Sequence, residues 1–152
     1  MGQHMLRKLM IGVMAVFALS AFAATSAMAD SPHFIGTPSA TVSGNSLLVT
    51  FKAAGLGTGN YADFSLTGTV DVSSRCYTKS GNKPQAANKQ ETLNVNQSGT
   101  FPVSHGQTTG SFTVTPLSTL RCPGGQHVVI ESVSYDLTLN GPGGITAPIT
   151  SP

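Results

Sequence analysis

The chain has no tryptophan and few charged residues, which make up 9% of it. A hydrophobic core must therefore be built from valine, leucine, isoleucine, phenylalanine and tyrosine. Glycine, serine, threonine and asparagine carry most of the polarity, and such a mixture disfavours long helices. The composition favours a β-rich extracellular protein.

Common catalytic and metal-binding motifs are also missing. The sequence contains neither the Gly-x-Ser-x-Gly elbow of hydrolases nor the His-Glu-x-x-His zinc motif. His33, His105 and His127 are far apart and lack ligand spacing. The glycine-spaced stretch AGLGTGNY precedes no predicted helix, so it is not a dinucleotide-binding loop. No motif supplies a nucleophile, base and orienting group, and we therefore expect no enzyme, no cofactor and no metal site.

The first 29 residues have the three parts of a cleavable signal peptide. Arg7 and Lys8 precede an uncharged apolar run, and Ala27 and Ala29 stand at the positions where a peptidase needs small side chains. The alternative is a membrane anchor, but the run has about 16 residues where a bilayer needs about 20. The sequence thus predicts a secreted protein, extracellular or periplasmic, with Met1 or Met5 as its start.

Removal of this segment changes the charge balance. The chain has eight basic and six acidic residues; without Arg7 and Lys8, six basic residues face six acidic ones. A neutral domain has no global attraction for nucleic acid, so we expect no nucleic-acid partner.

The two cysteines, Cys76 and Cys122, both follow the predicted cleavage site. An even number of cysteines in an exported chain indicates a disulfide. Closing a loop of about 46 residues is worth about 4 kcal/mol in the chain-entropy model. The alternatives are free thiols or metal ligands, but there is no Cys-x-x-Cys spacing to support a metal site.

Short stretches of period-two alternation, separated by turns, predict strands throughout residues 39–140. About seven strands of this kind indicate an all-β fold, an antiparallel Ig-like β-sandwich with one disulfide. We expect a turn at Ser98–Gly99, a β-bulge near Glu131–Ser132 and a loose Gly/Pro-rich tail over residues 141–152, so that the domain spans residues 30–140. The shared parity along each strand predicts a core of Leu47, Val49, Phe51, Phe64, Leu66, Val70, Val72, Phe112, Val114, Tyr135, Leu137 and Leu139.

Most of the positive charge gathers in a predicted polar loop over residues 77–90. The candidate partner-binding residues in or beside this loop are Arg75, Tyr77, Lys79, Lys83 and Lys89. The functional interpretation is a docking surface for an anionic partner, such as an acidic surface polymer. The alternative is a solvated loop that lysines keep soluble.

Several stretches, in order, resemble a family of small secreted bacterial proteins that has no assigned function. They are SGNSLLVTFKAAGLGTGNYADFSLTGTV, NKPQAANKQE, RCPGGQ and VVIESVSYDLTL, and the resemblance covers most of residues 39–140. It implies an Ig-like sandwich and no catalytic residue. AAGLGTGNY is also faintly similar to a hairpin region of the neocarzinostatin-type apoproteins. These have two disulfides, whereas this chain allows one.

The sequence therefore favours a secreted, non-catalytic binding or cell-exterior module of unknown ligand. One alternative is a carrier that holds a small ligand in a cleft between its sheets. Another is a hydrolase whose catalytic residues meet only in the folded chain.

We predict that the exported protein begins at Asp30, because Ala27 and Ala29 fit the peptidase sites before this residue. Mass analysis of the protein recovered outside the cytosol checks the prediction. A mass that includes the apolar run would contradict it.

Overall fold

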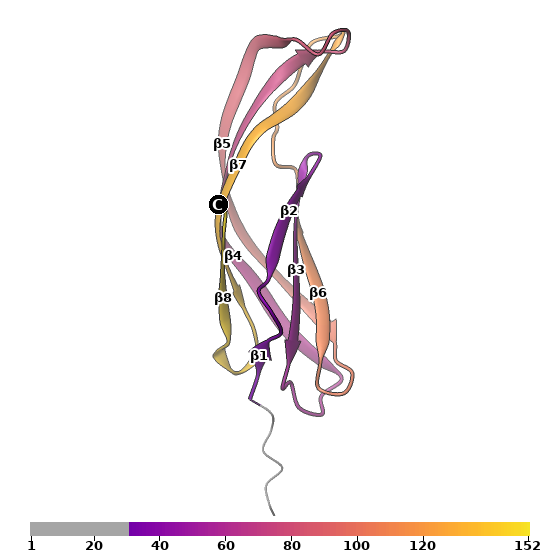
Figure 1. Ribbon diagram of the computed structural model, residues 1–152, viewed down its shortest axis with the longest axis vertical. Coiled ribbons are helices and arrows are strands. Elements are labelled where there is room, and N and C mark those ends of the chain that lie inside the picture. The colour runs from indigo at the N-terminus through magenta and orange to yellow at the C-terminus, as the bar shows by residue number, and fades with distance from the viewer. Residues whose placement is uncertain (1–30) are drawn as a thin grey trace, which may run out of the picture.

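The computed structural model describes residues 31–152 as two antiparallel sheets that face each other (Figure 1). The predicted signal peptide lies outside the described residues. The predicted all-β sandwich is confirmed, with eight strands where about seven were expected. The elements are β1 (His33–Phe34), β2 (Ser39–Ser43), β3 (Ser46–Ala54), β4 (Tyr61–Thr78), β5 (Pro84–Pro102), β6 (Thr108–Val114), β7 (Gln126–Asn140), the 3-10 turn η1 (Pro142–Gly144) and β8 (Thr146–Thr150).

The first sheet, sheet A, is built around β3. Strands β1 and β2 pair with one edge of β3, and β6 pairs with the other. Leu47, Val49 and Phe51 are buried, while Leu48 and Thr50 between them are exposed. This alternation, evident in the sequence, is what makes β3 a strand with one face in the core.

The second sheet, sheet B, has the strand order β5-β4-β7-β8. Its three long strands contain 18, 19 and 15 residues, whereas β3 contains nine. At about 3.3 Å per residue, β4 is roughly 60 Å long and β3 roughly 30 Å. Sheet B therefore extends far beyond sheet A (Figure 1). We call the projecting part of β4, β5 and β7 the arm; it comprises Ser74–Thr78, Pro84–Gln90 and Gln126–Ile130.

The core lies between the two sheets, and aromatic rings fill the end away from the arm. Phe34, Phe51, Phe64, Phe101 and Phe112 form one cluster with ring centroids 4.6–6.4 Å apart. Edge-on contacts predominate in this cluster, as expected for the quadrupoles of aromatic rings. The predicted core is confirmed except for Tyr135, which is half-buried.

The predicted disulfide and the predicted bulge are both confirmed. Cys76 is bonded to Cys122, with 5.6 Å between the two Cα atoms. Ser73 pairs with Ser132 and Ser74 with Ile130, so Glu131 is the extra residue of the bulge.

The prediction of a loose tail over residues 141–152 is wrong. Strand β8 pairs with Asp136–Asn140 at the end of β7, and Ala147 and Ile149 are buried. The domain thus continues beyond residue 140. The sequence pattern did not indicate this strand because it contains Pro148. An edge strand tolerates a proline at a position where the N–H would point away from the neighbouring strand.

The predicted loop over residues 77–90 and the predicted turn at Ser98–Gly99 are also wrong. Strand β5 runs without a break from Pro84 to Pro102, and only a tight turn separates it from β4. The arm part of β5 has no sheet packed on either face. It therefore has no need for the apolar alternation by which strands are recognised.

No helix of residues 31–152 is long and apolar enough to cross a membrane.

We predict that Gly68→Ala lowers the free energy of unfolding by about 2 kcal/mol or more. Gly68 lies in the middle of β4 at φ +135°, and a Cβ atom there would be 2.1 Å from the carbonyl oxygen of Asp136 on β7. The control is Gly57→Ala, where φ is +73° but nothing lies within 4 Å of the added atom. Denaturant unfolding measures both variants; equal losses would show that contact with β7 does not constrain Gly68.

Candidate functional site

The five predicted partner-binding residues do not form one surface. Arg75 and Tyr77 lie on the outer face of the arm, the face that points away from sheet A. Lys79 and Lys83 are exposed at the turn that ends the arm. Lys89 points to the opposite, inner face, where its ammonium contacts Thr119 and Glu91. The structure therefore brings together Arg75 with Tyr77 and, at the tip, Lys79 with Lys83.

Glu131 occupies the centre of the outer pair. Its carboxylate lies 3.2 Å from Nε of Arg75 and accepts a hydrogen bond of 3.0 Å from the Tyr77 hydroxyl. This hydrogen bond raises the pKa of Tyr77 above its ordinary value. Because Glu131 neutralises Arg75, the outer face has less positive charge than the sequence suggests.

The inner face of the arm is covered by a single stretch of chain, residues 115–125, which we call the crossing segment. It leaves the end of β6, climbs past the turn between β2 and β3, and reaches the start of β7 (Figure 1). Leu117 anchors its lower part by complete burial. The disulfide anchors its upper part, since Cys122 belongs to the segment and Cys76 to β4.

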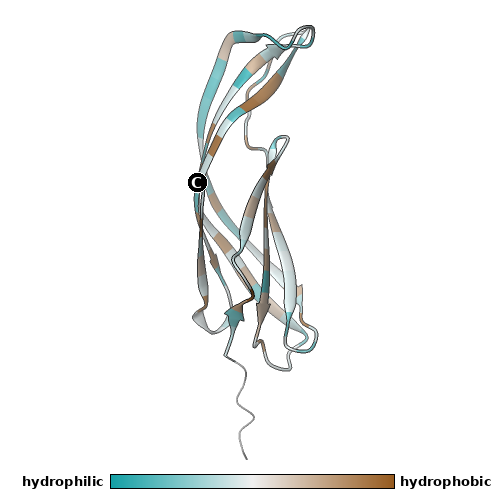
Figure 2. Ribbon diagram, viewed as in Figure 1, coloured by the Kyte–Doolittle hydropathy of each residue, from teal (hydrophilic) through white to brown (hydrophobic). Residues whose placement is uncertain are grey.

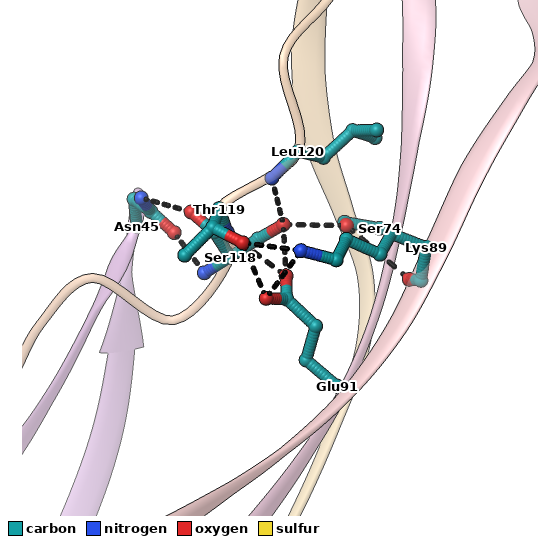
Figure 3. A network of polar contacts seen from close by, with 7 residues as sticks. All are labelled: Asn45, Ser74, Lys89, Glu91, Ser118, Thr119 and Leu120. Carbon is teal, nitrogen blue, oxygen red and sulfur yellow. Dashed lines mark hydrogen bonds and ion pairs between the residues drawn. The ribbon is translucent and has the colours of Figure 1, made fainter.

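A polar network fastens the middle of the crossing segment to both sheets (Figure 3). Glu91 of β5 accepts hydrogen bonds from the Ser118 hydroxyl at 2.9 Å, the Thr119 N–H at 2.8 Å and the Thr119 hydroxyl at 2.6 Å. Lys89 lies 3.0 Å from the same carboxylate. From the turn between β2 and β3, the Asn45 amide accepts a hydrogen bond from the Ser118 N–H at 2.8 Å and donates one to the Ser118 carbonyl at 3.1 Å.

Buried hydroxyls extend this network into the sheet. The hydroxyls of Ser74 and Ser118 are 2.6 Å apart, and Ser118 also accepts from the N–H of Leu120 at 3.1 Å. The Ser118 hydroxyl donates to Glu91, and the Ser74 hydroxyl also donates to the main-chain carbonyl of Lys89 at 3.3 Å. The Thr119 hydroxyl bond, together with the other donors, lowers the pKa of Glu91 to about 2. The Glu91 carboxylate therefore holds the crossing segment against β5.

An apolar groove opens beside the crossing segment, between the two sheets. Its volume is about 480 Å³, and we call it the β2–β7 groove. One wall is the end of β2 with the following turn, the opposite wall is the arm part of β7, and the crossing segment closes a third side. The lining residues are Val42, Gly44, Asn45, Ser118, Leu120, Val128, Val129 and Ile130.

The groove exists because sheet A is too short to cover β7. Val128 and Ile130 pair with Cys76 and Ser74, which are fully buried, yet both are themselves only half-buried. Val42 faces them from β2 with 42% of its surface exposed. The arm part of β7 is correspondingly one of the most hydrophobic stretches of sheet B (Figure 2). Exposed apolar side chains with a polar rim are typical of a binding surface.

A second hollow, of about 830 Å³, lies against the lower part of sheet B. Its lining is mixed, with polar residues such as Asp63 and Ser98 beside apolar ones such as Leu56 and Phe64. The Thr100 hydroxyl donates to Asp63 at 2.5 Å, so the carboxylate in this hollow already has a partner. The β2–β7 groove is the better candidate, since a larger share of its lining residues is apolar and its apolar side chains are incompletely covered.

Within residues 31–152, no cluster of three or more His, Cys, Asp or Glu side chains has the geometry of a metal site. Comparison with known proteins found no matching family model and no similar curated protein. The resemblances noted in the sequence therefore stay predictions.

Sequence reasoning missed both the network and the groove. Glu91 shares the inward parity of Leu93 and Val95, and a carboxylate at an inward position is the signal that would have revealed it. Nothing in the sequence shows that Ser118 and Asn45, 73 positions apart, are in contact. The groove residues had a weaker signal, the run of three apolar residues that precedes the bulge in β7.

We predict that Glu91→Gln removes part of the acid sensitivity of the fold. The folded chain holds the pKa of Glu91 at about 2, below the ordinary 4.5, so its ionised form is the one that folding favours. Its contribution is complete above about pH 4.5 and declines as the pH falls towards 2. At neutral pH, loss of the charge-assisted hydrogen bonds costs about 1–3 kcal/mol.

Urea unfolding between pH 2 and pH 7 measures this effect. The control is Asp136→Asn, on an exposed strand position of the same sheet. Glu91→Gln should flatten the decline of stability below pH 4.5, whereas Asp136→Asn should retain it. A decline that is identical in the two variants and the wild type would rule out the role of Glu91.

Proposed function

We propose that the protein is a secreted, non-catalytic binding module and that the β2–β7 groove is its binding surface. The observation that carries the proposal is the pair of apolar walls, Val42 on one side with Val128 and Ile130 on the other, which the short first sheet leaves open. A volume of about 480 Å³ lies within the range of ligand pockets, roughly 300–1,000 Å³.

The fastened crossing segment supports this proposal. A groove binds with little entropic cost when its walls are already held in the bound shape. Ser118 and Leu120 line the groove, and both are held by the hydrogen bonds around Glu91. The disulfide supports the secreted location, because structural disulfides persist outside the reducing cytosol.

An anionic partner at the tip of the arm is a second candidate. Lys79 and Lys83 favour it, since both are exposed on either side of one turn and neither forms an ion pair within residues 31–152. The two modes differ in their response to salt. Binding at the tip should weaken as ionic strength rises, whereas binding in the apolar groove should not.

We predict that Val42→Asp weakens binding of the neutral fluorophore N-phenylnaphthylamine by at least about tenfold, because an unpaired charge in an apolar groove costs more than 1.4 kcal/mol. Leu48→Asp is the matched control. Leu48 is 39% exposed against 42% for Val42, and it lies on the adjacent strand but faces away from the groove. Leu48→Asp should leave the affinity unchanged.

Fluorescence titration measures both variants, and circular dichroism shows that both are folded. Equal affinities in Val42→Asp and the wild type, or no binding of the fluorophore by the wild type, would overturn the assignment of the groove.

A further inference from the structure

The edge of β7 beside the groove is unpaired along the arm. Below it, β8 occupies this edge from Asp136 to Asn140, and the last contact is a hydrogen bond from the N–H of Ser151 to the carbonyl of Tyr135, at 3.0 Å. From Ser134 up to Gln126, no strand of residues 31–152 lies on this side of β7. Such an edge presents N–H and C=O groups that another strand can use.

The unpaired edge and the apolar wall belong to the same residues. Tyr135 directs its side chain towards sheet A and its main-chain groups towards the edge, as its bonds to Ser151 show. Val133 shares this orientation, and beyond the bulge so do Ile130 and Val128, whose partners on β4 face inward. Each of these residues thus offers both an apolar side chain and an unpaired peptide group.

Strand β8 shows what kind of segment fits such an edge. It runs antiparallel to β7, and its alternate residues Ala147 and Ile149 are buried against the core, while Thr146, Pro148 and Thr150 are exposed. A strand in line with β8 but higher along β7 would likewise direct every second side chain inward. At this height the inward direction leads into the β2–β7 groove.

We propose that an extended peptide segment of a partner protein adds to the free edge of β7 as an antiparallel strand, with apolar side chains at alternate positions in the β2–β7 groove. This inference rests on the proposed function, since it names the class of ligand that the groove takes. Hydrogen bonds to the β7 edge hold the main chain, and the groove selects the sequence. A second copy of this chain is the other candidate for the β7 edge, and sedimentation distinguishes it from a partner peptide.

Selection from a random library of 12-residue peptides tests the proposal. The wild-type chain should enrich peptides with apolar residues at alternate positions, and the Val42→Asp chain should not. In an enriched peptide, N-methylation of alternate amides should weaken binding by at least about tenfold in one of the two registers, because it removes main-chain hydrogen bonds and leaves the side chains intact.

Hydrogen exchange then locates the added strand. The bound peptide should slow exchange of the Val128, Ile130 and Val133 amides, while exchange along β5, whose outer edge is also unpaired, should not change. Enriched peptides without alternation, or full affinity after N-methylation in both registers, would overturn strand addition.

The outcomes separate this inference from the proposed function. If the fluorophore binds the groove but no alternating peptide does, strand addition is wrong and the groove remains a binding surface. If neither binds, both proposals are wrong. If the free protein is a dimer in sedimentation and already protects the three β7 amides, a second copy occupies the edge and a partner peptide does not.

Discussion

The mismatch in length between the two sheets is the constraint on which the rest of the structure depends. A long strand in water is stable only where its apolar face is covered, and β3 is only half as long as β4. Beyond the end of β3, the crossing segment is the part of the chain that packs against the inner face of the arm. Irregular backbone satisfies few of its own hydrogen bonds, so this stretch has to find partners on both sides.

Two different interactions attach the crossing segment to sheet B, a disulfide and a hydrogen-bond network. The bond between Cys76 and Cys122 is covalent and joins the upper part of the crossing segment to β4. The Glu91 carboxylate lies lower, where Ser118, Thr119 and Lys89 surround it with donors. A partly buried network of this kind stabilises the fold only when its buried members are paired, because an unpaired carboxylate or hydroxyl there would be costly. Asn45 completes it by pairing with both main-chain groups of Ser118, which joins the shorter sheet to the same point.

The sequence predicts the sandwich well where one face of a strand lies in the core and the other is exposed to solvent. Along β3 and the lower half of β4, every second residue is apolar, and the core follows from parity alone. In the arm this rule no longer applies. Ala86, Asn88 and Gln90 lie in β5, but one face of the strand is exposed to water there and no sheet packs on the other. The same reasoning failed for β8, because Pro148 is a turn signal in most contexts. The site depended on contacts between distant segments, which no local pattern encodes.

The strand order of sheet A has a consequence for the rate of folding. Strand β3 pairs with β6, and the hydroxyl of Ser46 donates to that of Thr115, 69 positions away. Strand β7 likewise pairs with β4, although β5 and β6 lie between these two strands in the sequence. Loops of this length must close before their contacts contribute any stability, and folds dominated by such pairings form in milliseconds to seconds. Until sheet A and the crossing segment are in place, Val128 and Ile130 lack even the partial cover that they have in the folded chain, so slow folding lengthens the time in which these side chains can aggregate.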